Sequence, residues 1–149
     1  MLAVQKTVAW SPKFSVGHPV LDSQHMGLLD LCNRAAACIE DDSPEGMDRF
    51  RSILFDLGSY VDIHFQTEEK LLKENHYPLL DEQQEEHADY AAKMDDFLLK
   101  ATFGVFDRVG LHQYLSHWWL HHILESDMQY KDFLLEISGR RGADLLQNQ

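Results

Sequence analysis

Four stretches of this sequence carry apolar side chains at helical spacing, and polar side chains interrupt each apolar stripe. Within each stretch the apolar residues recur three and four positions apart, which places them on one face of an α-helix. The stretches run about Asp22 to Glu40, Pro44 to Glu74, Leu80 to Ala101 and Asp107 to Ile137. We therefore expect four helices, each with one buried side.

Capping residues and helix breakers predict where these helices begin and end. Asp22 or Ser23 can cap the start of the first helix, and Ser43 followed by proline predicts the start of the second. The segment Asn75–Pro78 predicts the end of the second helix, and Ser138–Gly142 predicts the end of the fourth.

The pattern favours an all-α fold, since no segment shows the sustained period-two alternation of a β-strand. Four helices joined by short loops are typical of an up-down-up-down four-helix bundle. We expect a single domain over residues 1–149, with an irregular N-terminal arm over about 1–20, the bundle over about 21–137 and a polar tail over 138–149.

The charge balance excludes some classes of partner. Thirteen Lys and Arg against 25 Asp and Glu give a net charge of −12, which repels phosphate backbones and anionic lipid. No apolar run reaches the ~18 residues of a membrane span, and the N-terminus lacks the apolar core of a signal peptide. Cys32 and Cys38 lie on different faces of one helix, so they cannot pair. We expect reduced thiols in a cytoplasmic protein that binds neither nucleic acid nor membrane.

The polar residues on the apolar stripes are the candidates for a binding site. His64 and Glu68 are four residues apart and share one helix face, as do Gln83 and His87. A single histidine on an apolar face is more often a hydrogen-bonded core residue than a ligand. Burying four imidazoles and two carboxylates together is very costly, however, and a shared metal site compensates for all of them. The predicted ligands are His25, His64, Glu68, His87, His122 and Asp127.

These residue types limit the metal. Imidazole and carboxylate suit iron, manganese or zinc, and the absence of thiolate pairs argues against a structural zinc site. The donors are too many for one ion with an open position, whereas they fit two ions bridged by the carboxylates.

The spacing of His122 and Asp127 is unusual. The two residues are five apart, which is about 140° around a regular α-helix. Both can point inward only if the helix is distorted or the ions are offset, so we hypothesise a π-type bulge between them.

Several motifs match a known family. They are Val16–His25 with Trp10 upstream, His64–Glu69, Tyr77-Pro78, and the run from Trp118 through His122 to Tyr130. In these motifs the chain resembles the hemerythrin family, in particular its bacterial branch, over roughly Trp10 to Leu134.

The resemblance implies two non-haem iron ions joined by an oxygen bridge, with O₂ as the ligand. One iron would take His25 and His64, the other would take His87 and His122, and both carboxylates would bridge. Trp118 and Ile123 would line the ligand pocket, although each can equally be an ordinary core residue.

One position departs from the family pattern. Gln83 stands where the family has a fifth ligand histidine. Three replacements remain open: Gln83 itself through its carbonyl oxygen, a water molecule, or a nearby acid such as Glu82 or Glu86.

The resemblance leaves three function classes. The favoured one is O₂ binding for storage or transport. The alternative is an O₂- or redox-sensing input domain that acts on a partner or an attached output domain. An enzyme reacting with peroxide or nitric oxide is less favoured, and a ferritin-like oxidase is disfavoured because no histidine has a Glu three residues before it.

Overall fold

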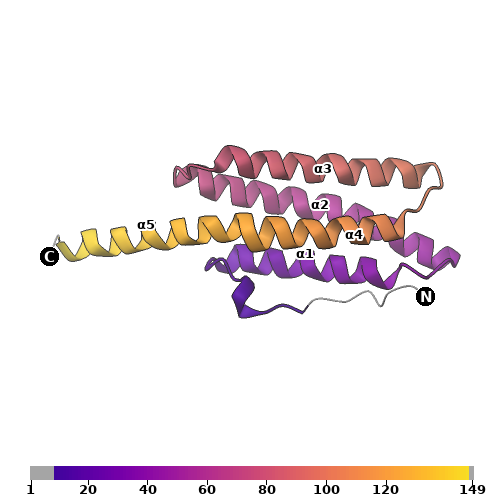
Figure 1. The fold of residues 1–149 in the computed structure, drawn as a ribbon, viewed down its shortest axis with the longest axis horizontal. Helices are drawn as coiled ribbons and strands as arrows, with labels where there is room; N and C mark the ends of the chain where they lie inside the picture. Colours follow the sequence, from indigo (N-terminus) through magenta and orange to yellow (C-terminus); the bar gives the residue numbers. More distant parts are fainter. Residues whose placement is uncertain (1–8, 148–149) are drawn as a thin grey trace.

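The computed structural model describes residues 9–147, which form a bundle of four long helices (Figure 1). The elements are η1 (Pro12–Phe14), α1 (Pro19–Ala37), α2 (Pro44–Glu74), α3 (Leu80–Thr102), α4 (Arg108–Trp118), η2 (Trp119–Ser126) and α5 (Asp127–Gln147). The last three run on as one helix, in which η2 is a π-helical stretch. Helix α2 packs against α1 and α3, and α1 packs against α4. The predicted all-α four-helix bundle is confirmed.

The predicted cap of α2 is confirmed, and Asp107, for which no capping role was predicted, caps α4. Ser43 and Asp107 each accept a backbone hydrogen bond at 3.0 Å, from Gly46 and Gly110 respectively. The predicted capping of α1 by Asp22 or Ser23 is wrong, because the helix begins at Pro19 and His18 caps it. The carboxylate of Asp22 instead accepts hydrogen bonds from the N-terminal arm, at Val16 N (2.8 Å) and Ser15 Oγ (2.5 Å).

Two helix ends also differ from the prediction. Helix α1 stops at Ala37, three residues before Glu40, and turns there. Helix α5 does not stop at Ser138–Gly142 but continues to Gln147, beyond the end of the bundle (Figure 1). Each glycine in that segment costs a helix only about 1 kcal/mol relative to alanine, and no proline follows to break it. The predicted polar tail is therefore helical through Gln147.

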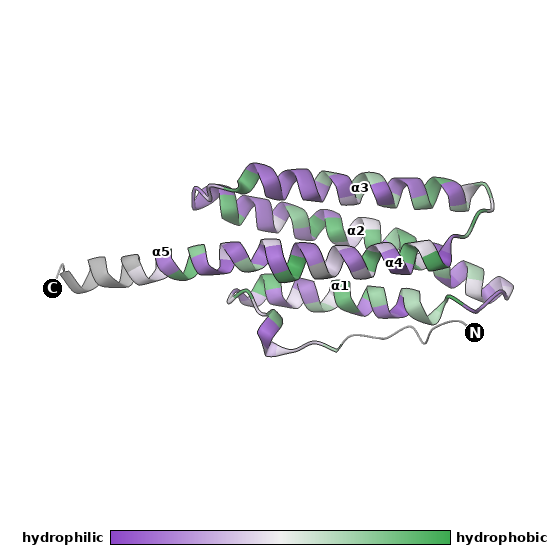
Figure 2. Ribbon diagram, in the orientation of Figure 1, coloured by the Kyte–Doolittle hydropathy of each residue, from purple (hydrophilic) through white to green (hydrophobic). Residues whose placement is uncertain are grey.

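The core consists of two apolar clusters. The larger spans most of the bundle and includes Phe50, Leu57, Phe65, Trp119 and Ile123. The smaller lies toward the other end of the bundle and comprises Val16, Leu21, Leu72, Tyr77 and Tyr130. Along α1, α2 and the last helix, His25, Glu68 and Asp127 fall between residues of the two clusters, and His64 and His122 lie next to residues of the larger cluster. Figure 2 shows the alternation of polar and apolar positions around every helix.

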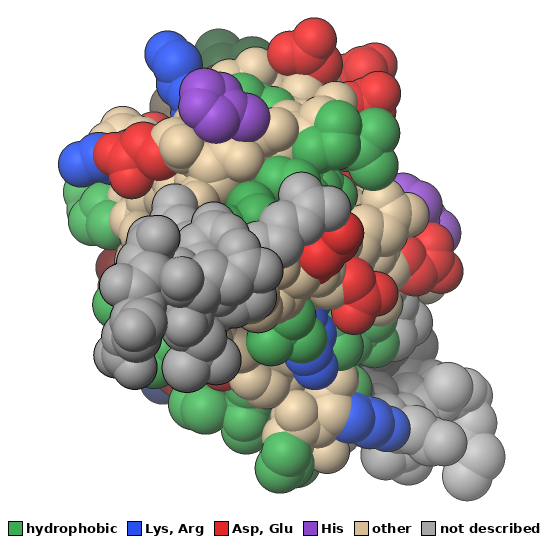
Figure 3. All heavy atoms as spheres, turned by 90° about the vertical axis from the view of Figure 1, so that its left-hand side faces the viewer, with side chains coloured by type: hydrophobic (Ala, Val, Ile, Leu, Met, Phe, Trp, Pro, Cys, Tyr) green, Lys and Arg blue, Asp and Glu red, His purple; other side chains and the backbone are tan. Residues whose placement is uncertain are grey.

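Every helix within residues 9–147 is too short or too polar to cross a bilayer. Acidic side chains gather on the upper and right-hand parts of the face from which α5 projects (Figure 3). They account for part of the net charge of −12.

Candidate metal centre

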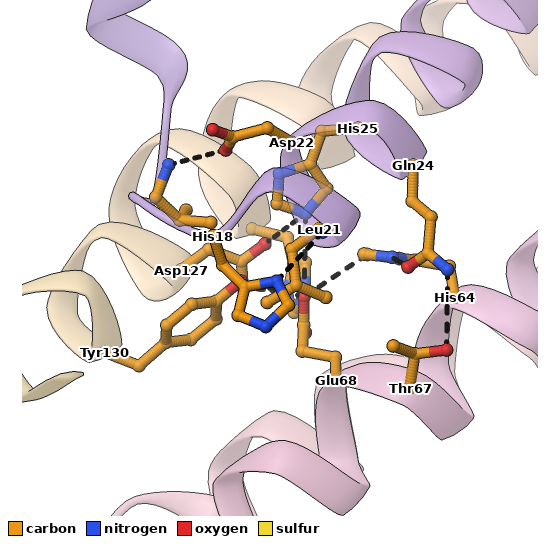
Figure 4. Close-up of polar contacts among 12 residues, drawn as sticks. His18, Leu21, Asp22, Gln24, His25, His64, Thr67, Glu68, Asp127 and Tyr130 are labelled. Carbon is orange, nitrogen blue, oxygen red and sulfur yellow. Dashed lines mark hydrogen bonds and ion pairs between the residues drawn. The ribbon is translucent and has the colours of Figure 1, made fainter.

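The six predicted ligands and Gln83 come together in one buried layer. His25 comes from α1, His64 and Glu68 from α2, His87 and Gln83 from α3, and His122 and Asp127 from the last helix. His25, Glu68, His122 and Asp127 are fully buried, and the other three are at most 4% exposed. Figure 4 shows His25, His64, Glu68 and Asp127 converging from three helices.

The Glu68 carboxylate faces imidazoles on both of its sides. Its Oε2 lies 3.5 Å from His25 Nε2 and 3.2 Å from His64 Nε2. Its Oε1 lies 2.9 Å from His87 Nε2 and 3.6 Å from His122 Nε2. One carboxylate oxygen therefore serves each half of the centre.

Asp127 repeats this division between the halves. Its Oδ2 lies 3.1 Å from Nε2 of His25, and its Oδ1 lies 3.2 Å from Nε2 of His122. Oδ1 also accepts a 3.0 Å hydrogen bond from Gln83 Nε2. The two carboxylates thus both stand between the pair His25–His64 and the pair His87–His122.

The π-helical η2 brings His122 and Asp127 to the same side. The backbone N–H of Asp127 donates to the carbonyl of His122, five residues earlier, where an α-helix would use the residue four earlier. Residues five apart then lie one above the other, as residues four apart do in an α-helix. The hypothesised π-type distortion is confirmed, and it explains how both side chains point inward.

Three imidazoles form a hydrogen bond through Nδ1, the ring nitrogen on the side away from the centre of the layer. The partners are Gln24 Oε1 for His64 (2.7 Å), Glu69 Oε2 for His87 (3.0 Å) and Glu86 Oε2 for His122 (2.5 Å). Such contacts orient an imidazole so that Nε2 faces the site, and carboxylate partners raise its basicity. No role was predicted for Gln24 or Glu69 themselves, although both lie inside the motifs that resemble the family and each is next to a predicted ligand in the chain.

Tyr130 also contacts the centre. Its hydroxyl donates a 3.1 Å hydrogen bond to Oε2 of Glu68. The hydroxyl of Tyr90, in contrast, is buried without a hydrogen-bond partner among the described residues.

The residues present fit a bound cation. Among the described residues, His25 Nε2, His64 Nε2, Gln83 Oε1 and Asp127 Oδ2 are buried polar atoms without a hydrogen-bond partner. His25 Nε2 and His64 Nε2 face carboxylate oxygens at 3.1 and 3.2 Å, so they can pair only when the imidazoles are protonated. An unpaired buried polar atom destabilises a fold by about 1–3 kcal/mol, and a bound cation would compensate for neutral imidazoles and carboxylates in this layer. Two groups of donor atoms lie close enough to hold an ion, namely His25, His64, Glu68 and Asp127, and Glu68, His87 and His122. Glu68 belongs to both groups.

The site is also strongly polarised without a metal. Burial opposes protonation of His25, but the carboxylates of Asp127 and Glu68 outweigh it and raise its pKa to about 9. Burial likewise opposes protonation of His122, and Asp127, Glu68 and Glu86 raise its pKa to about 10. Burial favours the neutral form of Glu68, yet the surrounding imidazoles hold its pKa well below the usual range.

The remaining candidates lie around this layer or away from it. Glu82 is exposed, whereas Glu86 binds His122 Nδ1 and so lies behind the imidazole. Trp118 stacks on the His122 ring at 4.3 Å between centroids, and Ile123 is fully buried in the larger cluster. His76, His117 and His121 are exposed, and His18 caps α1. Cys32 and Cys38 are buried free thiols.

Comparison with known families matches residues 16–134 to the family described as the hemerythrin HHE cation binding domain. The chain belongs to the hemerythrin family. The resemblance inferred from the motifs is thereby confirmed, and the cation-binding description agrees with the unpaired donor atoms of the buried layer.

Two relatives place this hemerythrin in the bacterial branch. A bacteriohemerythrin of Clostridium acetobutylicum is 25% identical over 126 residues, covering 83% of this chain and 98% of the relative. A bacteriohemerythrin of Stenotrophomonas maltophilia is 24% identical over 127 residues, covering 84% of this chain and 80% of the relative.

Proposed function

We propose that this hemerythrin holds two iron ions in the buried layer and binds O₂ there reversibly, for storage or transport. The observation that carries the proposal is the placement of Glu68, whose two oxygens face two separate pairs of imidazoles at 2.9–3.6 Å. A carboxylate in this position is suited to bridge two ions.

Each residue of the layer has a role in this proposal. His25 and His64 would hold one ion, and His87 and His122 would hold the other, with Glu68 and Asp127 shared. The mixture of imidazole and carboxylate donors without thiolate suits iron, and Cys32 lies in the apolar cluster. Iron, when bound, supplies the reversible electron transfer that O₂ binding requires.

The protein around the layer contributes orientation and exclusion of water. Gln24, Glu69 and Glu86 fix three imidazoles through Nδ1, and Tyr130 fixes the Glu68 carboxylate. Trp118 and Ile123 are proposed to line the ligand pocket. Trp118 covers one face of the His122 ring, and Ile123 directly follows His122 in η2.

Anaerobic purification followed by exposure to air tests this function. Two irons per chain and an oxygenated absorption band that disappears under vacuum would support O₂ binding. One iron or none after reconstitution would contradict the two-iron site. Turnover of peroxide or nitric oxide at rates above those of free iron would indicate an enzyme and not an O₂ carrier.

A sensing role is the second candidate, in which the centre reports O₂ or redox state to a partner or an output domain. The observation that favours it is the unbroken helix from His122 through Asp127 to Gln147, which leaves the bundle (Figure 1). Rapid oxidation in air that only a reductant reverses would favour sensing over storage.

A further inference from the structure

The two halves of the buried layer are not equal. One half offers four side chains with donor atoms close together, His25, His64, Glu68 and Asp127. The other half groups three, Glu68, His87 and His122. Asp127 faces this half as well, but through Oδ1, which accepts a hydrogen bond from Gln83. Both groups are buried throughout, so the difference lies in the number of donors free of another hydrogen bond and not in access to water.

Gln83 occupies the place where the poorer half lacks a donor. It lies four residues before His87 on α3, therefore on the same face, and its side chain is 2% exposed. Its amide nitrogen donates to Oδ1 of Asp127, the oxygen on the His122 side. An oxygen that already accepts this bond has less electron density to offer to an ion beside His122.

The side-chain carbonyl of Gln83 does not compensate for the missing donor in the poorer half. Oε1 is buried without a hydrogen-bond partner among the described residues, but a neutral amide oxygen is a weak donor beside imidazole. Glu69 and Glu86 strengthen His87 and His122 through Nδ1, yet neither adds a donor atom to the site.

We propose that the two cation positions differ in affinity and exchange rate, and that Gln83 sets the difference. The position at His25, His64, Glu68 and Asp127 fills first and retains its ion. The position at Glu68, His87 and His122 fills second and releases its ion first. This inference rests on the two-ion site of the proposed function, and it makes the second position the exchangeable one.

Timed removal of iron by a chelator tests the proposal. The wild-type protein is loaded with Fe²⁺ without oxygen and mixed with excess ferrozine, and the release of iron is followed by absorbance. We expect two phases of equal amplitude. Gln83→His adds an imidazole to the poorer half and should slow the fast phase at least about tenfold. Gln84→His is the matched control, since Gln84 is exposed on the same helix, and it should release iron as wild type does.

Two further variants assign the phases. His87→Gln should remove the fast phase and leave one retained ion, whereas His64→Gln should speed up the slow phase. Circular dichroism of each metal-free variant separates a lost ligand from a lost fold.

The outcomes distinguish this inference from the function on which it rests. Two ions that leave wild type in a single phase, or a Gln83→His variant that behaves like Gln84→His, would overturn the inference while leaving the two-iron site in place. Failure of wild type and Gln83→His to bind iron stoichiometrically would overturn both. One retained ion in wild type and two in Gln83→His would support the role of Gln83 in the second position while overturning the two-iron function of the wild-type protein.

Discussion

Nδ1 of His122 and Oε2 of Glu86 lie 2.5 Å apart, so a carboxylate from α3 supports the imidazole from the side opposite the metal centre. Glu86 also accepts a hydrogen bond from Ser126 Oγ at 2.8 Å. These two hydrogen bonds of Glu86 therefore fix the direction in which His122 presents Nε2.

Glu86→Gln should weaken the retention of the ion held by His122. The amide can still accept from Nδ1–H but no longer carries charge, and loss of such a partner lowers metal affinity about 10–100-fold. Chelator competition measures the effect. Glu85→Gln, an exposed neighbour, is the control, and equal retention by the two variants would contradict the role of Glu86.

Glu68→Gln should abolish binding of both ions, because the carboxylate serves both halves of the centre. Glu69→Gln should spare one of them, since Glu69 supports His87, which belongs to one half of the centre. Metal analysis after gel filtration gives the stoichiometry of each variant. If Glu68→Gln kept two ions, Glu68 would not be the shared ligand.

Metal binding should release protons. The pKa values of His25 and His122 are raised to about 9 and about 10, so both imidazoles are charged at neutral pH in the metal-free protein. Ions must displace these protons, and metal affinity should therefore rise as the pH increases through 7–10. Calorimetric titration in two buffers of different ionisation enthalpy counts the protons, and identical heats in both buffers would contradict the prediction.

The same shifts predict how the stability of the metal-free protein depends on pH. A folded-state pKa above the unfolded value of 6.5 means that the charged imidazole stabilises the fold. That contribution is complete below about pH 6.5 and is lost as the pH rises through about 9 to 10. The melting temperature of the metal-free protein should fall over this range, while the metal-loaded protein, whose imidazoles are already neutral, should show no such fall.

Deletion of Glu125 should convert η2 to a regular α-helix. His122 and Asp127 would then be four residues apart and the rest of α5 would keep its face toward the bundle. We expect an unchanged helical circular dichroism spectrum, a metal-free melting temperature no lower than the parent's, and retention of the stoichiometric metal, because residues four apart in an α-helix share one face, as His64 and Glu68 do. Glu125→Ala keeps the chain length and should also bind metal normally, because Glu125 is exposed. Loss of the metal by the deletion variant alone would contradict this prediction and show that the π-helix sets more than the shared direction of the two side chains.

Side-chain periodicity predicted the bundle and the convergence of the buried His, Glu and Asp side chains, for a physical reason. A buried His or Glu on an apolar stripe is visible because it breaks the pattern, and the five-residue gap from His122 to Asp127 has few solutions in a helix. The start of α1 was mispredicted although Pro19 stands at its first position, as Pro44 does in α2. Asp22, the expected cap, bonds instead to the arm preceding the helix. Glu69 and Gln24 escaped detection because their roles depend on which imidazole a neighbouring helix places beside them.

Helix α5 begins at Asp127, a proposed ligand, and is 21 residues long, or about 30 Å at 1.5 Å per residue. Its first two turns pack against the bundle through Tyr130 and Phe133, and its far end projects beyond the bundle (Figure 1). A shift of Asp127 would thus reach the projecting end only through this apolar contact, which connects the buried layer to a surface outside the bundle.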